Sequence, residues 1–145
     1  MEDLELLFEP CPSDSLTSFL TDNMSNLNYA RTGISEGQRV GYFLRNARGE
    51  WLGALRGYVW GGWLHVDFVW VAEVLRGQGL GSRLMDAAEA FAAEHGAFAV
   101  TLETHSFQAP DFYTKRGYTV FGRLDDYPPG HAKLFLRKRL DGLTA

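Results

Sequence analysis

Residues 69–91 read VWVAEVLRGQGLGSRLMDAAEAF, and this stretch constrains the fold more than any other part of the chain. It begins as an apolar run typical of a buried strand. It ends with apolar residues spaced three and four apart, which predicts an amphipathic helix. Between them lie Gly77, Gly79 and Gly81, at every second position. Because a helix start exposes backbone N–H groups to which the helix dipole adds, and glycine lets a ligand approach closely, the stretch predicts a phosphate or pyrophosphate site.

Spacing excludes two well-known phosphate-binding loops. The dinucleotide fingerprint needs its last glycine where this chain has Ser82, and the P-loop needs a lysine after its final glycine, where Ser82 also stands. A third pattern, Arg/Gln-x-x-Gly-x-Gly/Ala, is complete from Arg76 through Gly79 to Gly81. It follows the strand at the expected distance.

The rest of the chain predicts a mixed α/β or α+β sheet covered by helices. The length of 145 residues, without repeats or linkers, predicts one domain over residues 1–145. Strand patterns occur at residues 3–8, in three runs within 39–71, and at 97–106, 118–124 and 133–140. Helix patterns occur at about 14–30, 80–95 and 109–116, the first started by Pro12 and Ser13.

Composition narrows the function class. The net charge of −4 disfavours nucleic acid as a partner and permits a cationic small substrate such as an amine. Cys11 is the only cysteine, so neither an internal disulfide nor a cysteine metal site is expected. No run reaches the roughly 18 apolar residues that span a bilayer, and the acidic start lacks signal-peptide features, so no membrane association and a cytoplasmic location are expected.

Two signatures in this order resemble the GCN5-related N-acetyltransferase (GNAT) family. The first is FVWVAEVLRGQGLGSRLMDAA, which is similar to the family's strand, loop and helix. The second is LETHSFQAPDFYTKRGYTVFG, a strand and a short helix that ends in Phe112-Tyr113 and Gly117-Tyr118. The resemblance covers roughly residues 40–140, and the amino-terminal strand and helix match only by their order.

The resemblance implies a GNAT-like fold and an acetyl-CoA-dependent N-acetyltransferase. The expected sheet is mostly antiparallel and twisted, with six to seven strands, flanked by helices, and its parallel central strands splay at the cofactor site. The acceptor would be a primary amine of a small molecule or peptide, which attacks the thioester directly in a ternary complex. Acetyl-CoA would be the acetyl donor, with no metal. The alternative is a non-catalytic acyl-CoA sensor on the same fold. Many relatives are dimers, and the sequence leaves the oligomeric state open.

The resemblance also implies a cofactor site. Backbone groups of the glycine turn would hold the pyrophosphate, and the edge of strand 64–71 would hold the pantetheine arm. The family often has an asparagine seven residues before its tyrosine, where this chain has Ser106, and Gln108 is a candidate replacement. The expected cofactor-binding residues are Val69, Val71, Arg76, Gly77, Gln78, Gly79, Leu80, Gly81, Ser82 and Gln108.

Catalytic candidates come from the two central strands and the short helix. By resemblance, Tyr113 is the general acid that protonates the thiolate, a role that a phenol with a pKa near 10 can fill. Strand alternation places Asp67 and Glu103 beside a common cleft, and these two are the leading candidates for the base, with His65 third. The same alternation predicts that Trp70 lies in the core. The turn DDYPPGHA, with Asp125, Asp126, Tyr127 and His131, would lie on the acceptor side or be a solvated turn.

Overall fold

The computed structural model describes residues 2–143 and divides the chain into two compact units, one ending at Glu36 and one beginning at Gly37. We describe each unit by itself. The prediction of one domain over residues 1–145 stays a prediction.

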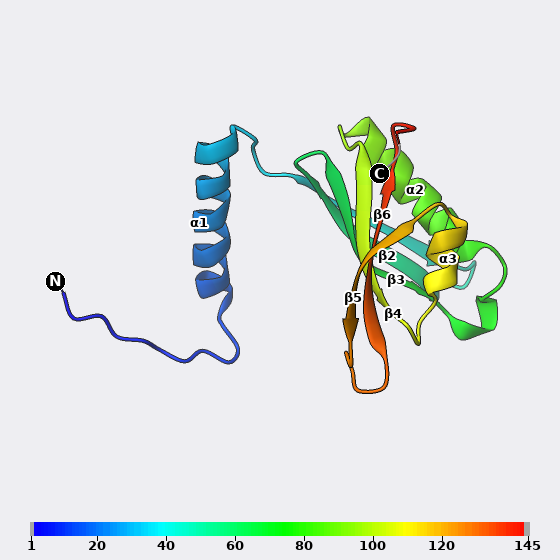
Figure 1. Cartoon of the computed structure of the whole chain (residues 1–145), viewed down its shortest axis with the longest axis horizontal. Helices are drawn as coiled ribbons and strands as arrows, with labels where there is room; N and C mark the ends of the chain where they lie inside the picture. The colour runs from blue at the N-terminus through cyan, green and yellow to red at the C-terminus, as the bar shows by residue number, and fades with distance from the viewer. Residues whose placement is uncertain (1, 144–145) are drawn as a thin grey trace. The chain divides into compact units, whose positions relative to one another are not determined.

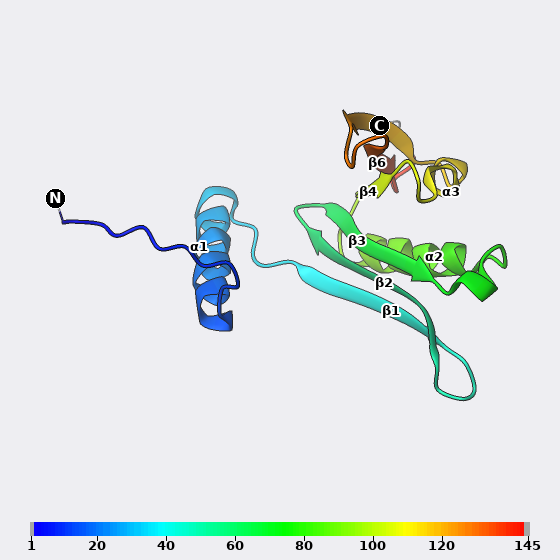
Figure 2. The same cartoon turned by 90° about the horizontal axis from the view of Figure 1, so that it is seen from below.

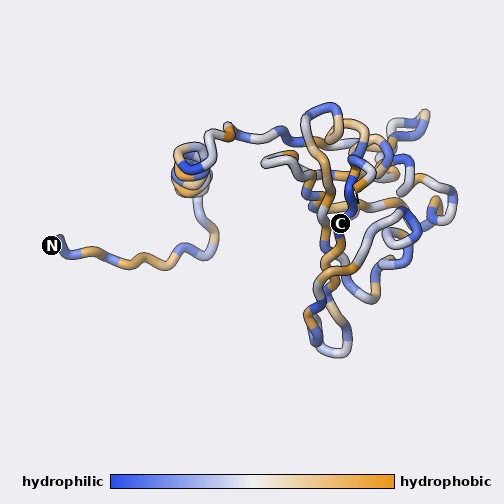
Figure 3. The backbone as a smooth tube through the Cα atoms, turned by 45° about the horizontal axis from the view of Figure 1, so that its top comes forward, coloured by the Kyte–Doolittle hydropathy of each residue, from blue (hydrophilic) through white to orange (hydrophobic). Residues whose placement is uncertain are grey.

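The first unit is the helix α1 (Asp14–Thr32) with the segment before it. Ser13 caps the helix, because its side chain accepts a hydrogen bond from the backbone N–H of Leu16 at 3.2 Å, and Gly33 ends it in the left-handed conformation. The predicted helix is therefore confirmed. The predicted strand at residues 3–8 is wrong, since these residues form no regular structure and find no partner strand for their backbone groups. Figure 3 shows apolar residues along this segment.

The second unit is a six-stranded sheet with two helices (Figure 1). The strand order is β1-β2-β3-β4-β6-β5, and only the β3–β4 pair is parallel. The predicted mixed sheet of six to seven strands is thereby confirmed. The elements are β1 (Gln38–Arg45), β2 (Trp51–Trp60), β3 (Trp63–Val71), the 3-10 turn η1 (Glu73–Leu75), α2 (Leu80–Glu94), β4 (Ala99–His105), α3 (Pro110–Lys115), β5 (Thr119–Asp125) and β6 (Ala132–Arg139).

The parallel central strands separate part of the way along. Pairing between β3 and β4 begins at Trp63↔Ala99 and ends at Val66↔Leu102, although both strands continue. Figure 2 shows the two groups of strands diverging, with β1, β2 and β3 beside α2, and β4 and β6 beside α3. Among the described residues 2–143, β3 pairs with no residue on its β4 side from Asp67 onward. We call this point the fork.

A β-bulge in β3 reverses the strand's faces just past the fork. Arg56 of β2 pairs with Phe68, and the next residue, Gly57, pairs with Val66, so Asp67 is the extra residue. Strict alternation therefore fails after Asp67. Phe68 and Trp70 point away from the core, and Trp70 is 52% exposed, which makes the prediction of a buried Trp70 wrong.

The core lies mainly between α2 and the first three strands. The helix buries Leu84, Met85, Ala88 and Ala92 against the sheet, as its apolar spacing predicted. Because of the bulge, Val69 and Val71 also pack against this core. Within residues 2–143, no helix combines the length and hydropathy that crossing a membrane requires.

Candidate active site

The glycine turn leads into α2 in the conformation that the sequence predicted. Gly77 and Gly79 have φ angles of 80° and 79°, in the left-handed region that favours glycine. Gly79 is the N-cap of α2, and no side chain caps the helix. A Cβ at either glycine would meet nothing within 4 Å, so the space beside the turn is open. The first amides of α2 are thus free of side-chain caps and can be reached by an anion.

Gly81 has a different role from the two glycines before it. It lies within α2, and a Cβ there would come within 3.2 Å of the Phe112 ring. Its missing side chain therefore makes room for α3 rather than for a ligand. Their regular spacing predicted the same ligand-binding role for all three glycines, because spacing carries no information about contacts with α3.

Arg76 ties the glycine turn to the end of β3. Its Nε donates to the carbonyl oxygen of Val71 at 3.1 Å. This bond fixes the start of the turn relative to the strand and engages the Val71 carbonyl. Both predicted backbone positions on β3 lie past the fork. Val69 follows the bulge, and the carbonyl oxygen of Val71 accepts the Arg76 bond.

An imidazole and two carboxylates meet at the fork. The His65 Nε2 lies 2.7 Å from Glu103 Oε2, and the His65 Nδ1 lies 3.0 Å from Asp67 Oδ1. Arg56 Nε lies 3.4 Å from the other oxygen of Asp67. The structure thus brings the three predicted residues together, in a cluster whose side chains stay between 31% and 43% exposed. The sequence did not predict Arg56, since its approach depends on the bulge.

Tyr113 lies on α3 beside the start of α2. Its ring packs against the core and meets Phe112 and Tyr118 edge to face, with centroids 4.9 and 5.8 Å away. Phe112, the residue before Tyr113, lies against Gly81 in the first turn of α2, so this part of α3 packs on the start of α2. Burial raises the pKa of the Tyr113 phenol above its ordinary value, so the hydroxyl keeps its proton at neutral pH.

Gln108 holds the end of β4. Its Oε1 accepts from the His105 backbone N–H at 2.9 Å and from the Thr104 hydroxyl at 3.1 Å. Ser106 binds elsewhere, because its hydroxyl accepts from the backbone N–H of Ala132 at the start of β6. The amide oxygen of Gln108 is therefore already engaged, and only its amide nitrogen remains for the predicted cofactor contact.

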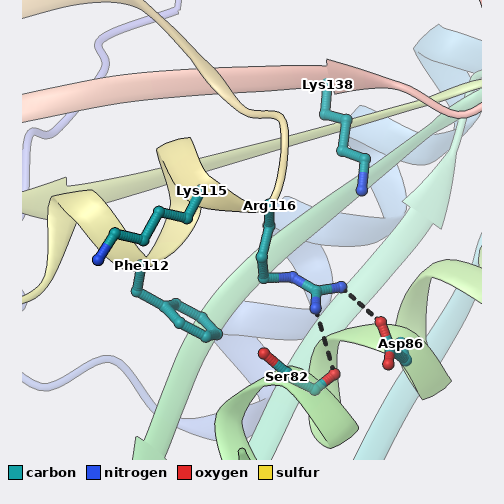
Figure 4. Close-up of a pocket in the computed structure, with 6 residues that line it drawn as sticks. All are labelled: Ser82, Asp86, Phe112, Lys115, Arg116 and Lys138. Carbon is teal, nitrogen blue, oxygen red and sulfur yellow. Dashed lines mark hydrogen bonds and ion pairs between the residues drawn. The ribbon is translucent and has the colours of Figure 1, made fainter.

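A second ionic cluster, which the sequence did not predict, fastens α3 and β6 to α2. The carboxylate of Glu89, only 8% exposed, binds Arg116 through one oxygen and Lys138 through the other, the latter at 2.7 Å. Arg116 also binds Asp86 at 2.8 Å and the Ser82 carbonyl at 3.5 Å, beside an open pocket (Figure 4). The sequence feature that could have predicted this cluster is the carboxylate of Glu89, which lies on the otherwise apolar face of α2. We name Glu89, Arg116 and Lys138 the anchor cluster.

The fold places an open glycine turn with an uncapped helix start after β3, whose fork carries an imidazole and two carboxylates. The sequence signature of the acetyltransferase (GNAT) family matches residues 2–118. The chain therefore belongs to this family.

Individual relatives agree with this assignment. The chain is 44% identical over 114 residues to the blasticidin-S acetyltransferase of Streptomyces morookaense, covering 76% of this chain and 84% of that one. It is 31% identical over 120 residues to an acetyltransferase of Agrobacterium fabrum, covering 83% and 88%. A crystal structure of an acetyltransferase from Bacillus cereus superposes with a TM-score of 0.79 at 31% identity, covering 92% and 98%.

The family and these relatives make the chain an acetyl-CoA-dependent N-acetyltransferase. They give no support to the non-catalytic sensor. A Bacillus anthracis structure solved with acetyl coenzyme A shares the fold, with a TM-score of 0.61 at 20% identity. The open, uncapped start of α2 fits the pyrophosphate of this donor.

Proposed function

We propose that this enzyme acetylates a primary amine of a small cationic molecule, which enters at the fork. The observation that carries the proposal is the position of the fork. β3 bears Asp67 and His65 at the fork and leads directly into the uncapped glycine turn. A donor held at the turn and along the free edge of β3 would therefore present its thioester next to acid–base groups.

The donor is proposed to be held by backbone groups. The amides from Gly77 to Ser82 would bind the pyrophosphate, with Arg76 bracing the turn against Val71. Past the fork, the β4-facing edge of β3 near Val69 would bind the pantetheine arm as an added strand. When bound, acetyl-CoA supplies the activated acetyl group.

The fork cluster is proposed to receive the proton from the amine. Glu103 contacts His65 through one oxygen only, so its second oxygen can accept a hydrogen bond from an incoming amine. His65 lies between Glu103 and Asp67, and a ring bridging two carboxylates can pass a proton from one to the other. Arg56 offsets part of the negative charge of Asp67.

Tyr113 is proposed to donate a proton to the departing thiolate. Its support is the protonated, half-buried phenol and its position beside the start of α2. A phenol that is protonated at neutral pH has a proton available for a sulfur anion.

A cationic acceptor is favoured by the carboxylates at the fork and by one relative. Asp67 and Glu103 provide carboxylates at the fork. Opposite charges raise both the encounter rate and the affinity of a cation. The relative named for blasticidin S, at 44% identity, makes blasticidin S the first acceptor to test. The compartment and a homodimeric state remain predictions.

The donor site is tested by calorimetry with acetyl-CoA. We expect micromolar binding, and Gly79→Val should weaken it at least about tenfold, because a β-branched residue cannot adopt a φ of 79° without strain. Gly49→Val is the matched control, since Gly49 has a φ of 85° and open surroundings but lies in the β1–β2 turn. Equal binding by both variants would refute the donor site.

The acceptor is tested by release of free thiol from acetyl-CoA with a panel of amines. The panel contains blasticidin S, nourseothricin, an aminoglycoside, spermidine and a peptide with a free amino terminus. Mass spectrometry identifies the acetylated nitrogen. Turnover that is fastest with a small cationic amine supports the proposal, and turnover only with the peptide contradicts it.

A further inference from the structure

Beyond the fork, β4 ends in a group of ring-bearing side chains that the acid–base chemistry does not use. His105, the last residue of β4, stacks on Phe107 with centroids 5.2 Å apart at an angle of 26°. His105 also lies 5.8 Å from Tyr127, and Phe107 meets His131 edge to face at 5.0 Å. We call these four residues the ring cluster. Tyr127 and His131 come from the turn between β5 and β6, which Figure 1 shows extending beyond the rest of the sheet.

The ring cluster is exposed to solvent and lies on the same face of β4 as Glu103 of the fork. Phe107 is 54% exposed and Tyr127 is 49% exposed. His105 is on the same face of β4 as Glu103, two residues further along, which is about 7 Å in a strand. A small molecule with its amine at Glu103 could therefore lay its other end on these rings.

The charges around the ring cluster select among aromatic-binding ligands. Lys133 already places its Nζ 5.0 Å from the Tyr127 centroid, where a cationic ligand would otherwise bind. Asp126, the residue before Tyr127, accepts a hydrogen bond from the Gly130 N–H within the same turn. Lys133 would repel a second cation at Tyr127, whereas a neutral flat ring would stack on Phe107 without that cost.

Gln108 holds this surface in place. Its Oε1 fixes the His105 backbone N–H at 2.9 Å and lies 3.3 Å from the His105 Nδ1. The imidazole is thereby oriented against Phe107 before any ligand arrives. A preformed surface loses less conformational entropy on binding than a mobile one.

We propose that the ring cluster is a stacking subsite for a neutral, flat, conjugated ring carried by the acceptor amine. The acceptor would then have two parts, an amine at the fork and a planar ring on Phe107. This inference rests on the proposed function for the amine end, whereas the ring end can be measured without catalysis.

The kinetic test compares phenethylamine with cyclohexylethylamine, which share the ethylamine chain but carry a flat aromatic ring and a puckered saturated ring, respectively. We expect a lower KM for phenethylamine, and we expect Phe107→Leu to raise that KM roughly fivefold while kcat and the KM for cyclohexylethylamine change little. The matched control is Phe121→Leu, since Phe121 is 50% exposed on β5 and contacts Phe135 rather than the ring cluster. Equal changes for the two amines, or no change, would overturn the proposal.

A binding test separates this inference from the proposed function. The chain has four histidines, so their ring-proton NMR signals can be assigned with single His→Asn variants. We expect benzamide to shift the signals of His105 and His131, cyclohexanecarboxamide to shift them less, and Phe107→Leu to abolish the difference. Equal shifts, or no shift, would overturn the stacking subsite. Inactivity toward all amines beside a selective benzamide shift would instead overturn only the assigned acceptor chemistry.

Discussion

Glu89 and Glu103 are both glutamates, but Glu89 lies in the anchor cluster and Glu103 lies at the fork. Glu89 is 8% exposed, and each of its oxygens binds a cation. The Glu103 side chain is 32% exposed and contacts His65 through one oxygen. A carboxylate whose oxygens are both engaged can hold elements together, whereas one with a free oxygen can also react. The difference predicts that stability depends on Glu89 and turnover on Glu103.

The largest expected effect is on folding. Glu89→Gln should lower the free energy of unfolding by about 3 kcal/mol, because Lys138 loses its carboxylate partner and Arg116 keeps only the exposed Asp86. Urea denaturation followed by circular dichroism measures the change. Asp86→Asn is the control, because Asp86 binds the same arginine but its side chain is 72% exposed, so less than about 1 kcal/mol is expected. Equal losses of unfolding free energy in the two variants would show that the anchor cluster contributes no more to stability than an exposed ion pair.

The next effect is on catalysis. Glu103→Gln should lower kcat about a hundredfold, because an amide cannot accept the proton of the amine. Its free energy of unfolding should stay within about 0.5 kcal/mol of the wild type. Steady-state thiol release and urea denaturation measure the two quantities. The exposed Glu94 at the end of α2 gives the control, Glu94→Gln, which should change neither. Full activity of Glu103→Gln would show that Glu103 is not the general base.

Tyr113→Phe should have a smaller effect on turnover. We expect kcat to fall about tenfold with acetyl-CoA affinity nearly unchanged, because only the donated proton is lost. Burial raises the pKa of Tyr113 above its ordinary value of 10.0, so wild-type activity should not fall through loss of this proton until the pH exceeds that value. Rates measured between pH 7 and pH 10 check this. Tyr42→Phe, a change in another half-buried tyrosine, should be silent, and an unchanged kcat in Tyr113→Phe would remove the acid role.

Tyr118→Phe should have the smallest effect at neutral pH. Within residues 2–143 the Tyr118 hydroxyl is buried without a hydrogen-bond partner, so its removal should change the free energy of unfolding by less than about 1 kcal/mol. Burial, and then the nearby Glu89 carboxylate, raise the pKa of Tyr118. In the unfolded chain the Tyr118 phenol has a pKa near 10. The folded protein therefore keeps its full stability below that pH and loses stability as the pH rises above it, because the unfolded chain then releases a proton that the folded protein retains.

Urea denaturation at pH 7 and above pH 10 tests this sign. The wild type should lose more stability than Tyr118→Phe over that interval, and Tyr113 should account for part of the loss that remains in the variant. An identical loss in both proteins would mean that Tyr118 ionises as readily when folded as when unfolded.

Sequence reasoning succeeded where the signal is local. Ser13 and Gly33 mark the ends of α1, and positive φ angles at Gly77 and Gly79 follow from glycine's lack of a side chain. It failed at residues 3–8, because their strand pattern finds no partner strand. A strand needs a neighbour for its backbone groups, and a pattern in one segment carries no information about that neighbour.

The sequence by itself determined the order of the elements, the glycine turn and the family, because each depends on residues that are close together in the chain. Only the tertiary structure decided the bulge at Asp67, which turned Trp70 outward and Val69 inward. It also decided the fork, which joins His65 to Glu103 across 38 positions of sequence. These features depend on how β3 pairs with β2 on one side and separates from β4 on the other, and pairing between distant strands is a property of the folded chain.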